Sequence, residues 1–393
     1  MKKFILGILF CGLSFAAQAN MNGNGFYRVM NYGSSRWASL IDDHATVDFF
    51  AGSADLHSLE LSNDTEAMLS DPGSIVYINN VSGNQYNVAA QGVTLADLVD
   101  NPVSIRAGGT NNGENLYYIY GTYKGNTKYI GDGNLMTDDE FGYASLNVYY
   151  TQFKQWIITP VDANSDNYYG VVPNVKTSND LYTTVYTSFS YQPYSSGVKA
   201  YYISRIWKGM AEMVEINGII PAACPVVIKC AGAKPSDNKM QVLTDNVALP
   251  VNALKGVYFD FQNKSITNQV KYDPKIMRIL GTCADGSLGF VTSDINYIPA
   301  NTAYLQVPEG SPAEIKCVTT SEFEAGVEEI AYDASSLRYS NNIITSEGSS
   351  KIVVMNMEGK TMLQSTDGKL DVSPLPKGLY IAVSGGKSIK IFR

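Results

Sequence analysis

The stretch that decides the fold is Leu375–Arg393, LPKGLYIAVSGGKSIKIFR. Apolar and polar residues alternate on both sides of Gly385-Gly386, and this period of two is typical of β-strands with one buried face. A Gly-Gly pair supplies the positive φ angles that a two-residue hairpin turn requires. The stretch therefore predicts an ordered β-hairpin at a position where most chains fray.

Residues 323–393, which contain this hairpin, have a composition of their own. Further turn pairs stand at Glu358-Gly359 and Asp367-Gly368, and Asp-Gly and Gly-Gly are the stronger signals for tight hairpin turns. From residue 350 onward there are seven lysines and arginines and three acids, a formal charge of +4, whereas the whole chain carries −8. We therefore predict a separate C-terminal small β-sandwich over residues 323–393.

The composition of the whole chain favours an all-β protein. Tyrosine (27 residues) and glycine (34 residues) are abundant, and aromatic residues separated by Gly and Asn turns are typical of β-structure. Outside the extreme N-terminus, no long run has apolar residues at helical spacing. A chain of 393 residues is expected to form two or three domains.

The first residues, MKKFILGILFCGLSFAAQAN, are typical of a cleaved signal peptide. Lys2 and Lys3 precede an apolar run, and Ala17-Gln18-Ala19 supplies the small residues of a cleavage site. The alternative is a membrane anchor, which needs a longer apolar run and a basic stop after it. We assign residues 1–19 as the signal peptide and expect an exported mature chain without a transmembrane span.

The charge of the mature chain argues against nucleic acid as a partner. Removing residues 1–19 removes two lysines and no acid, so the formal charge falls from −8 to −10. Nucleic-acid-binding proteins present basic clusters, and this sequence has none.

Residues 20–168 contain a loose repeat of hairpins, with starts at Phe26, Val76, Tyr117 and Trp156. A period near 40 residues made of hairpins indicates a propeller or a trefoil, and three intervals are too few for a propeller of four blades. An aromatic residue opens the second strand of each hairpin. We favour core packing for these residues, and ligand stacking is the alternative. On that alternative, the candidate ligand-binding residues are Trp37, Tyr86 and Tyr129.

Residues 169–322 are predicted to form a β-sandwich-like middle domain. Two related strings, IPAACPVV from Ile220 and IPANTAYL from Ile298, each place a proline before an alternating run. Proline fixes φ, and the run that follows indicates a strand.

The cysteines of the mature chain all lie in this middle region. In an exported protein, Cys224, Cys230, Cys283 and Cys317 are candidates for one or two disulfides. If Cys224 and Cys230 belong to one strand, they share a face but lie about 20 Å apart, too far to pair with each other. Pairing with Cys283 or Cys317 stays open, and buried free thiols are the alternative.

Three regions of the chain resemble known families. GFYRVMNYGSSRWASL (25–40) and FKQWIITPV (153–161), with its Gln155-Trp156 pair, resemble ricin-type β-trefoil segments. That resemblance implies an N-terminal β-trefoil-like domain and a lectin-like family that often binds carbohydrate through an Asp, an aromatic residue and an Asn or Gln on each lobe. This sequence does not repeat such a triad. SSGVKAYYIS (195–204) with IIPAACPVVIK (219–229) is similar to a β-rich module of exported Bacteroidetes proteins.

The C-terminal region resembles the sorting domain of the Bacteroidetes type IX secretion system. The matching parts run from Ile352 to Lys360, from Leu370 to Ile381 and from Lys387 to Arg393. The resemblance implies that this domain takes the protein across the outer membrane, with Gly378, Leu379 and Tyr380 in the sorting motif. It also makes the secretion machinery a partner.

Few residues offer chemistry. A metal site from Asp42, His44, Asp55 and His57 is conceivable, but we favour surface loops. Asp162, Asn164 and Asp166 alternate as calcium ligands do, but the Gly and closing Glu of an EF-hand are missing, which favours a turn. No nucleophile motif is present. We predict no catalytic residue, no metal and no cofactor.

The leading hypothesis is a secreted or outer-membrane-surface, non-enzymatic binding protein with a carbohydrate or host-matrix protein as ligand. One alternative is a hydrolase with a carboxylate pair brought together in three dimensions. Another is a structural or assembly protein of the surface.

Overall fold

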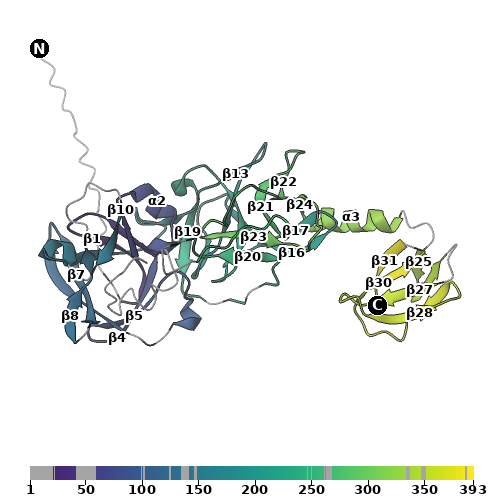
Figure 1. Ribbon diagram of the computed structural model, residues 1–393, viewed down its shortest axis with the longest axis horizontal. Helices are drawn as coiled ribbons and strands as arrows, with labels where there is room; N and C mark the ends of the chain where they lie inside the picture. Colours follow the sequence, from purple (N-terminus) through teal and green to yellow (C-terminus); the bar gives the residue numbers. More distant parts are fainter. Residues whose placement is uncertain are drawn as a thin grey trace, which may run out of the picture. The chain divides into compact units, whose positions relative to one another are not determined.

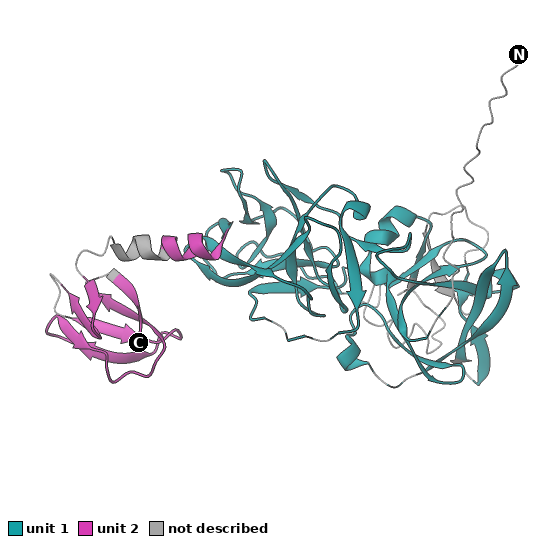
Figure 2. Ribbon diagram, turned by 180° about the vertical axis from the view of Figure 1, so that it is seen from behind, with its two compact units in different colours: residues 1–317 teal, residues 318–393 magenta. Residues whose placement is uncertain are grey.

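The computed structural model is all-β, with strands that form five sheets and two α-helices among the residues it describes (Figure 1). The described residues are 21, 23–40, 59–98, 100, 102–123, 125–133, 141–145, 148–245, 247–248, 250–260, 262, 268–332, 337–346, 351–385 and 387–393. The chain divides into two compact units, Met1–Cys317 and Val318–Arg393 (Figure 2). The all-β prediction is confirmed.

The N-terminal part of the first unit is built on a closed antiparallel ring of six strands. These are β1 (Gly25–Asn31), β4 (Val76–Ser82), β5 (Gln85–Ala89), β6 (Val103–Asn111), β7 (Glu114–Tyr123) and β11 (Gln155–Pro160). The ring closes because β1 pairs with both β4 and β11. Trp156 fills its interior, fully buried, and donates its indole N–H to the carbonyl of Ile130 at 2.9 Å.

Shorter elements extend from this ring. They are β2 (Trp37–Leu40), β3 (Leu59–Ser62), β8 (Asn126–Tyr129), β9 (Gly131–Asp132), β10 (Phe141–Ser145), helix α2 (Thr65–Ser70) and the 3₁₀ turns η1 (Pro72–Ser74), η2 (Leu95–Asp97) and η3 (Thr151–Lys154). A ring of six antiparallel strands is what a trefoil requires, but its lobes differ here. In the order of the chain, the hairpin β2–β3 lies between β1 and β4, whereas only the short turn η2 lies between β5 and β6. The trefoil stays a prediction.

The middle part contains two sheets. The larger has the order β13 (Val175–Lys176), β14 (Leu181–Val185), β18 (Val226–Cys230), β16 (Lys199–Trp207), β17 (Met210–Ile216), β24 (Glu314–Val318), β22 (Leu288–Val291), β21 (Met277–Thr282), β23 (Thr302–Gln306) and β20 (Leu254–Val257). The smaller has the order β12 (Tyr169–Gly170), β19 (Lys239–Leu243) and β15 (Ser190–Pro193), next to the 3₁₀ turn η4 (Pro235–Asp237). One core contains side chains of both sheets, as in a sandwich. A second core joins Tyr182 on β14 to Leu305 on β23, so the larger sheet curls back on itself.

The two Ile-Pro-Ala strings adopt the same local structure. Ile220 and Ile298 are buried, and the fourth residue of each string, Ala223 or Asn301, has a φ near +57° or +59°. The strands β18 and β23 follow these turns, as predicted. Asn tolerates the left-handed region better than most residues, whereas Ala does so at a cost of about 1 kcal/mol.

Gln91 joins the N-terminal ring to the middle part. Its side chain is 1% exposed. The amide donates to Oδ1 of Asn301 at 2.6 Å and to the carbonyl of Tyr186 at 3.3 Å, and its oxygen accepts from the N–H and the hydroxyl of Ser188. Residues 20–168 and 169–322, which we predicted as separate domains, thus pack together within one compact unit, and the second unit begins at 318.

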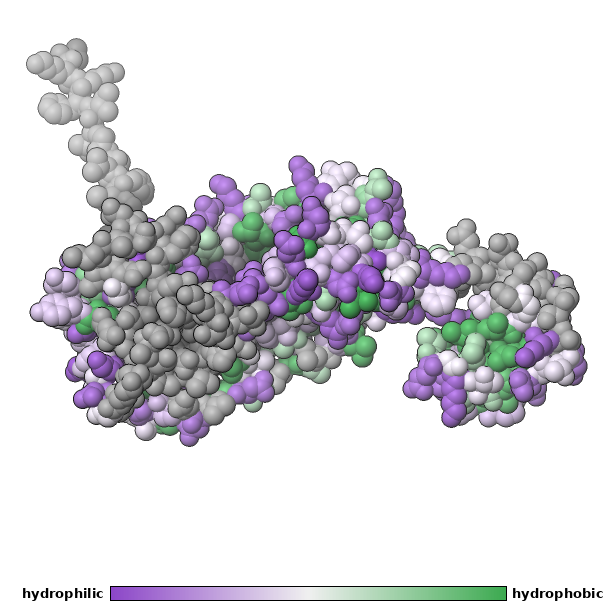
Figure 3. All heavy atoms as spheres, in the orientation of Figure 1, coloured by the Kyte–Doolittle hydropathy of each residue, from purple (hydrophilic) through white to green (hydrophobic). Residues whose placement is uncertain are grey.

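The C-terminal unit is a small sandwich around its own core. One sheet contains β25 (Leu337–Ser340), β26 (Ile343–Ser346) and β29 (Lys369–Asp371), and the other contains β28 (Thr361–Ser365), β27 (Ile352–Met355), β30 (Leu379–Ser384) and β31 (Lys387–Phe392). Buried residues of both sheets, such as Ile344 and Val354, share one cluster. Figure 3 shows apolar side chains gathered on the visible face of this unit.

The terminal hairpin is confirmed, and one of the other predicted turns has a different role. β30 and β31 pair from Leu379↔Phe392 to Ser384↔Lys387, with Gly385 at φ +58°. Gly359 turns β27 into β28 as a hairpin. The Asp367-Gly368 turn is not a hairpin, because β28 pairs with β27 whereas β29 pairs with β26. It carries the chain from one sheet to the other.

Helix α3 (Thr320–Tyr332) was not predicted. Apolar residues do occur at helical spacing in this segment, at positions 323, 327, 330 and 331, but the run is short and contains Gly326, and the prediction considered only long runs. A local signal was present in Thr319-x-x-Glu322. The N–H of Thr319 donates to the Glu322 carboxylate at 2.8 Å, and the N–H of Glu322 donates to the Thr319 hydroxyl at 3.3 Å. This is a capping box, which marks a helix start.

Candidate functional site

A pocket of about 290 Å³ lies between the β2–β3 hairpin and the middle part of the first unit. We call it the Trp37 pocket. Its walls are formed by Trp37, Ser39, Leu40, Glu60, Ser62, Asp64, Ala67, Met68, Asp71, Tyr258, Phe259, Asp260, Ala300 and Asn301. Sequence positions more than 200 apart therefore meet at one site.

The β2–β3 hairpin presents one face to the pocket. Trp37 pairs with Ser62 and Ser39 pairs with Glu60 across the two strands, so these four side chains share a face. Ala38, which points the other way, is buried in the core of the ring, whereas Trp37 is only half-buried. The alternation of the strand therefore leaves the indole ring available at the pocket wall.

Asp71 forms the floor of the pocket. Its carboxylate accepts from the Ser39 hydroxyl, from the N–H of Gly73 at 2.8 Å and from the Nδ2 of Asn301 at 3.4 Å. It is also the residue that caps η1. Burial raises the pKa of Asp71 above its usual value, and the hydrogen bonds from Ser39 and Gly73 and the charge of Arg28 oppose that rise. Asp71 is thus held in place by several groups.

Arg28 supports this floor from within the protein. It is fully buried on β1 and donates to the Ser74 hydroxyl, to Oδ1 of Asn167 and to the carbonyls of Tyr168 and Leu69. Desolvation lowers the pKa of Arg28 to about 10, and the negative charge of Asp71 opposes this effect. A buried cation near Asp71 keeps the local charge balanced.

Glu60 differs from Asp71 because its carboxylate lacks a partner within the described chain. Burial raises the pKa of Glu60, and the charge of Asp71 raises it further. The backbone of Glu60 pairs with Ser39 and Tyr143 in the sheet, but its carboxylate has no hydrogen bond or ion pair among the described residues. A half-buried acceptor of this kind gains most from a ligand that donates hydrogen bonds.

The opposite wall comes from the middle part. Tyr258 stacks on Tyr186, with ring centroids 4.1 Å apart, and Phe259 packs into the core of the ring. Asp260 accepts from the N–H of Ala300 at 3.1 Å. These contacts fix the aromatic side chains in position before a ligand arrives.

The chemistry of the Trp37 pocket is that of aromatic rings next to hydrogen-bond acceptors. Four carboxyl groups line it, from Glu60, Asp64, Asp71 and Asp260, and no lysine, arginine or histidine is among the described residues of the lining. Hydroxyl groups can donate to such carboxylates, and an apolar ring face can stack on Trp37. An anionic ligand would be repelled.

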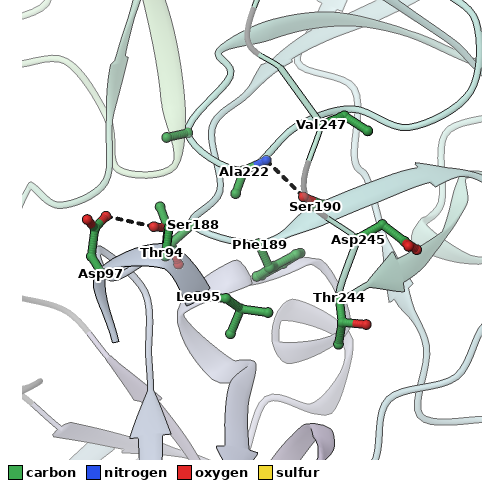
Figure 4. Close-up of a pocket in the computed structure, with 12 residues that line it drawn as sticks. Thr94, Leu95, Asp97, Ser188, Phe189, Ser190, Ala222, Thr244, Asp245 and Val247 are labelled. Atoms are coloured by element: carbon green, nitrogen blue, oxygen red, sulfur yellow. Dashed lines mark hydrogen bonds between the residues drawn. The ribbon is translucent and has the colours of Figure 1, made fainter. Parts of the chain in front are cut away.

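A second pocket of about 360 Å³ lies between η2 and the middle part (Figure 4). Several of its polar side chains already have partners, whereas Thr244 and Asp245 form no side-chain hydrogen bond or ion pair among the described residues. The Thr94 hydroxyl donates to Asp97 at 2.6 Å, Ser190 accepts from the N–H of Ala222 at 3.1 Å, and Ser188 contacts Gln91. Its one aromatic lining residue in the described part of the chain, Phe189, is buried in a core, so this pocket offers no half-buried indole ring of the kind that Trp37 provides.

The three predicted ligand-binding residues do not form one site. Trp37 lines the pocket, Tyr86 packs against the core of the ring, and Tyr129 lies among half-buried tyrosines on β7 and β8. Sequence analysis missed Glu60, Asp71 and Asn301. No sequence signal identifies them, because only the tertiary fold brings them together.

The four cysteines among the described residues, Cys224, Cys230, Cys283 and Cys317, are free thiols. Cys224 and Cys230 lie in the same core, and burial raises the pKa of their thiols to about 11 and about 12. Burial also raises the pKa of Cys283 and of Cys317, and these two thiols are close enough to influence each other. The alternative of buried thiols therefore describes this structure.

The predicted sorting motif is part of the terminal hairpin. Gly378 exchanges backbone hydrogen bonds with Arg393, Tyr380 is buried and donates its hydroxyl to the carbonyl of Pro376 at 3.0 Å, and Leu379 is 36% exposed. Only Leu379 of the three therefore presents a large side chain to a partner.

Of the two candidate metal sites, only the one around Asp162 lies within the described residues. Asp42, His44, Asp55, His57 and residues 1–19 lie outside the described residues. Asp162 forms a turn by accepting from the N–H of Asn164 at 2.9 Å. Within the described ranges, no cluster of three or more His, Cys, Asp or Glu side chains could hold a metal ion. In that same part of the chain, no helix has the length and apolar character needed to cross a membrane.

Comparison of the chain with protein-family models, with curated proteins and with solved structures gives no match.

Proposed function

We propose that the protein is a secreted or cell-surface binding protein that holds a neutral glycan in the Trp37 pocket. The observation that carries this proposal is that the half-buried Trp37 shares a pocket with Glu60, whose carboxylate has no partner among the described residues. A sugar ring offers an apolar face for the indole and hydroxyl donors for the carboxylate.

The size and charge of the pocket limit the ligand. About 290 Å³ is at the lower end of ligand pockets, which suits one or two sugar units at the end of a chain. Four carboxyl groups, with no cation among the described lining residues, disfavour acidic sugars. We therefore favour neutral hexoses over a host-matrix protein as ligand.

The route to the cell surface is part of the same proposal. Residues 1–19 would direct export, and the C-terminal unit would act as a sorting domain of the type IX kind. Its support is that Val318–Arg393 forms a compact unit of its own and ends in an ordered hairpin. The six-stranded ring likewise supports a trefoil-like architecture for the binding domain.

A glycan array with the full mature chain, followed by calorimetric titration of the best ligand, tests the binding proposal. The substitution Trp37→Ala should weaken binding at least about tenfold, because it removes a stacking surface. Tyr149→Ala is the matched control, since Tyr149 is 85% exposed and lies outside the pocket. If no neutral glycan binds, or if both variants bind equally well, the proposal fails.

A hydrolase is the second candidate because Glu60 and Asp71 are both acids with raised pKa values in one pocket. A raised pKa is typical of a general acid. We favour binding because Asp71 already accepts three hydrogen bonds and caps η1, so it is not free to act as base or nucleophile. Release of nitrophenol from nitrophenyl glycosides, abolished by Glu60→Gln, would instead establish the hydrolase.

A further inference from the structure

Three tyrosines and an arginine gather on the outer surface of the ring. Tyr118 and Tyr120 lie on β7, Tyr129 lies on β8, and Arg106 lies on β6. Arg106 pairs with Tyr118 across one strand pair and Tyr120 pairs with Tyr129 across the next. We call this group the tyrosine face. None of its four residues lines the Trp37 pocket.

The guanidinium of Arg106 is held by the rings around it. Its central carbon lies 5.1 Å from the ring centroid of Tyr118 and 5.7 Å from those of Tyr120 and Tyr129. One Nη2 hydrogen bond reaches the hydroxyl of Tyr129 at 2.9 Å. Arginine stacked in this way is oriented in advance, so less entropy is lost when it binds an anion.

The rings also support one another. The ring of Tyr129 lies 5.4 Å from that of Tyr118, edge to face, and 5.6 Å from that of Tyr120. Gly108 on β6 leaves space for this arrangement, because a Cβ there would lie 3.2 Å from the ring of Tyr118. The tyrosine face is therefore an ordered surface.

Its positive charge has no carboxylate partner. Arg106 is exposed, and the Nζ of Lys154 lies 6.0 Å from the ring of Tyr129. Neither cation forms an ion pair with an acid in the described part of the chain, although the chain has a formal charge of −8. In an acidic protein, two unpaired cations beside aromatic rings fit an anionic ligand.

We propose that the tyrosine face binds an acidic saccharide, in which a carboxylate or sulfate contacts Arg106 and Lys154 while a sugar ring stacks on a tyrosine. The planar guanidinium matches a carboxylate or a sulfate in a bidentate manner. A long nucleic acid fits poorly, because its phosphates would extend beyond two cations onto an acidic surface. The site goes beyond the proposed function, since the Trp37 pocket repels anions.

Titration of the full mature chain with tetragalacturonate, at low and high salt, tests this proposal. The neutral galactotetraose serves as the uncharged probe. Tetragalacturonate should bind, and its affinity should fall as salt rises. Arg106→Gln should lower that affinity at least about tenfold, because a charge-assisted contact is removed. Tyr129→Phe, which keeps the ring and removes the hydroxyl that holds Arg106, should lose a smaller factor.

Controls separate this site from general charge and from the Trp37 pocket. Lys255→Gln removes one exposed positive charge elsewhere and should leave tetragalacturonate binding within about twofold. Trp37→Ala should leave it unchanged while neutral glycan binding falls. The proposal is overturned if tetragalacturonate does not bind, if Arg106→Gln binds as well as the unsubstituted chain, or if Lys255→Gln has the same effect as Arg106→Gln.

Discussion

Replacing Gln91 with leucine is expected both to destabilise the first unit and to weaken glycan binding in the Trp37 pocket. Gln91 is buried and lies at the start of a hydrogen-bond chain: its amide donates to Asn301, and Asn301 donates to Asp71 on the pocket floor. Leucine fills a similar volume, so the main loss is polar rather than a cavity.

The magnitude follows from the groups left without partners. The N–H of Ser188, at a residue only 4% exposed, loses its acceptor. A buried donor without a partner costs about 1–3 kcal/mol. The hydrogen bonds from Gln91 to Asn301 and Tyr186 contribute about 1 kcal/mol more in total. The contribution is small because Asn301 and Tyr186 are only half-buried, so water can replace the lost donor. We expect a fall of about 2–4 kcal/mol in the free energy of unfolding.

Equilibrium unfolding in urea measures this change. Three tryptophans report the transition by fluorescence: Trp37 and Trp156 in the N-terminal part and Trp207 in the middle part. The matched control is Gln85→Leu, since Gln85 makes one side-chain hydrogen bond, to Ser104 on the neighbouring strand. That variant should lose about 1 kcal/mol or less. Equal losses in the two variants would refute the role assigned to Gln91, and so would unchanged glycan affinity in Gln91→Leu.

Three further outcomes are expected. Because the pKa of Glu60 is raised in the folded state, the folded chain binds a proton more tightly than the unfolded chain, so the contribution of Glu60 to stability is lost as pH rises through 4.5 to the raised value. The free energy of unfolding, measured in urea between pH 4 and 7, should therefore fall less steeply with rising pH in Glu60→Gln than in the unsubstituted chain, and identical slopes would contradict this. Because Cys224 and Cys230 have thiol pKa values near 11 and 12, the native mature chain should react slowly with a disulfide reagent at pH 8, whereas urea should expose all four thiols; fast reaction of the native chain would show that the thiols are accessible. Deletion of residues 318–393 should leave the first unit folded, by circular dichroism and a cooperative melt, and should stop surface delivery in the source cell; normal delivery would remove the sorting proposal.

Local sequence signals predicted what local chemistry determines. The Gly385 turn and the strands after Ile220 and Ile298 appear where period-two alternation and turn residues placed them. The Asp367-Gly368 turn shows that such local signals do not determine strand pairing. The dipeptide determines that the chain turns, but the partner of the strand after it depends on which sheet buries Leu370 and its neighbours.

The candidate site could not be predicted from local sequence signals, because residues far apart in the chain form it. Trp37 could be named from its place in a hairpin, yet its identity as a pocket residue rather than a core residue depends on Ala38 taking the buried face. Asp71 and Asn301 are 230 residues apart, and each taken alone is an ordinary turn residue. Their meeting depends on Gln91, which fixes Asn301 against the N-terminal ring. The pocket is therefore a property of the interface between two segments, so a change at Gln91, which does not line the pocket, should alter ligand binding as much as a change in its wall.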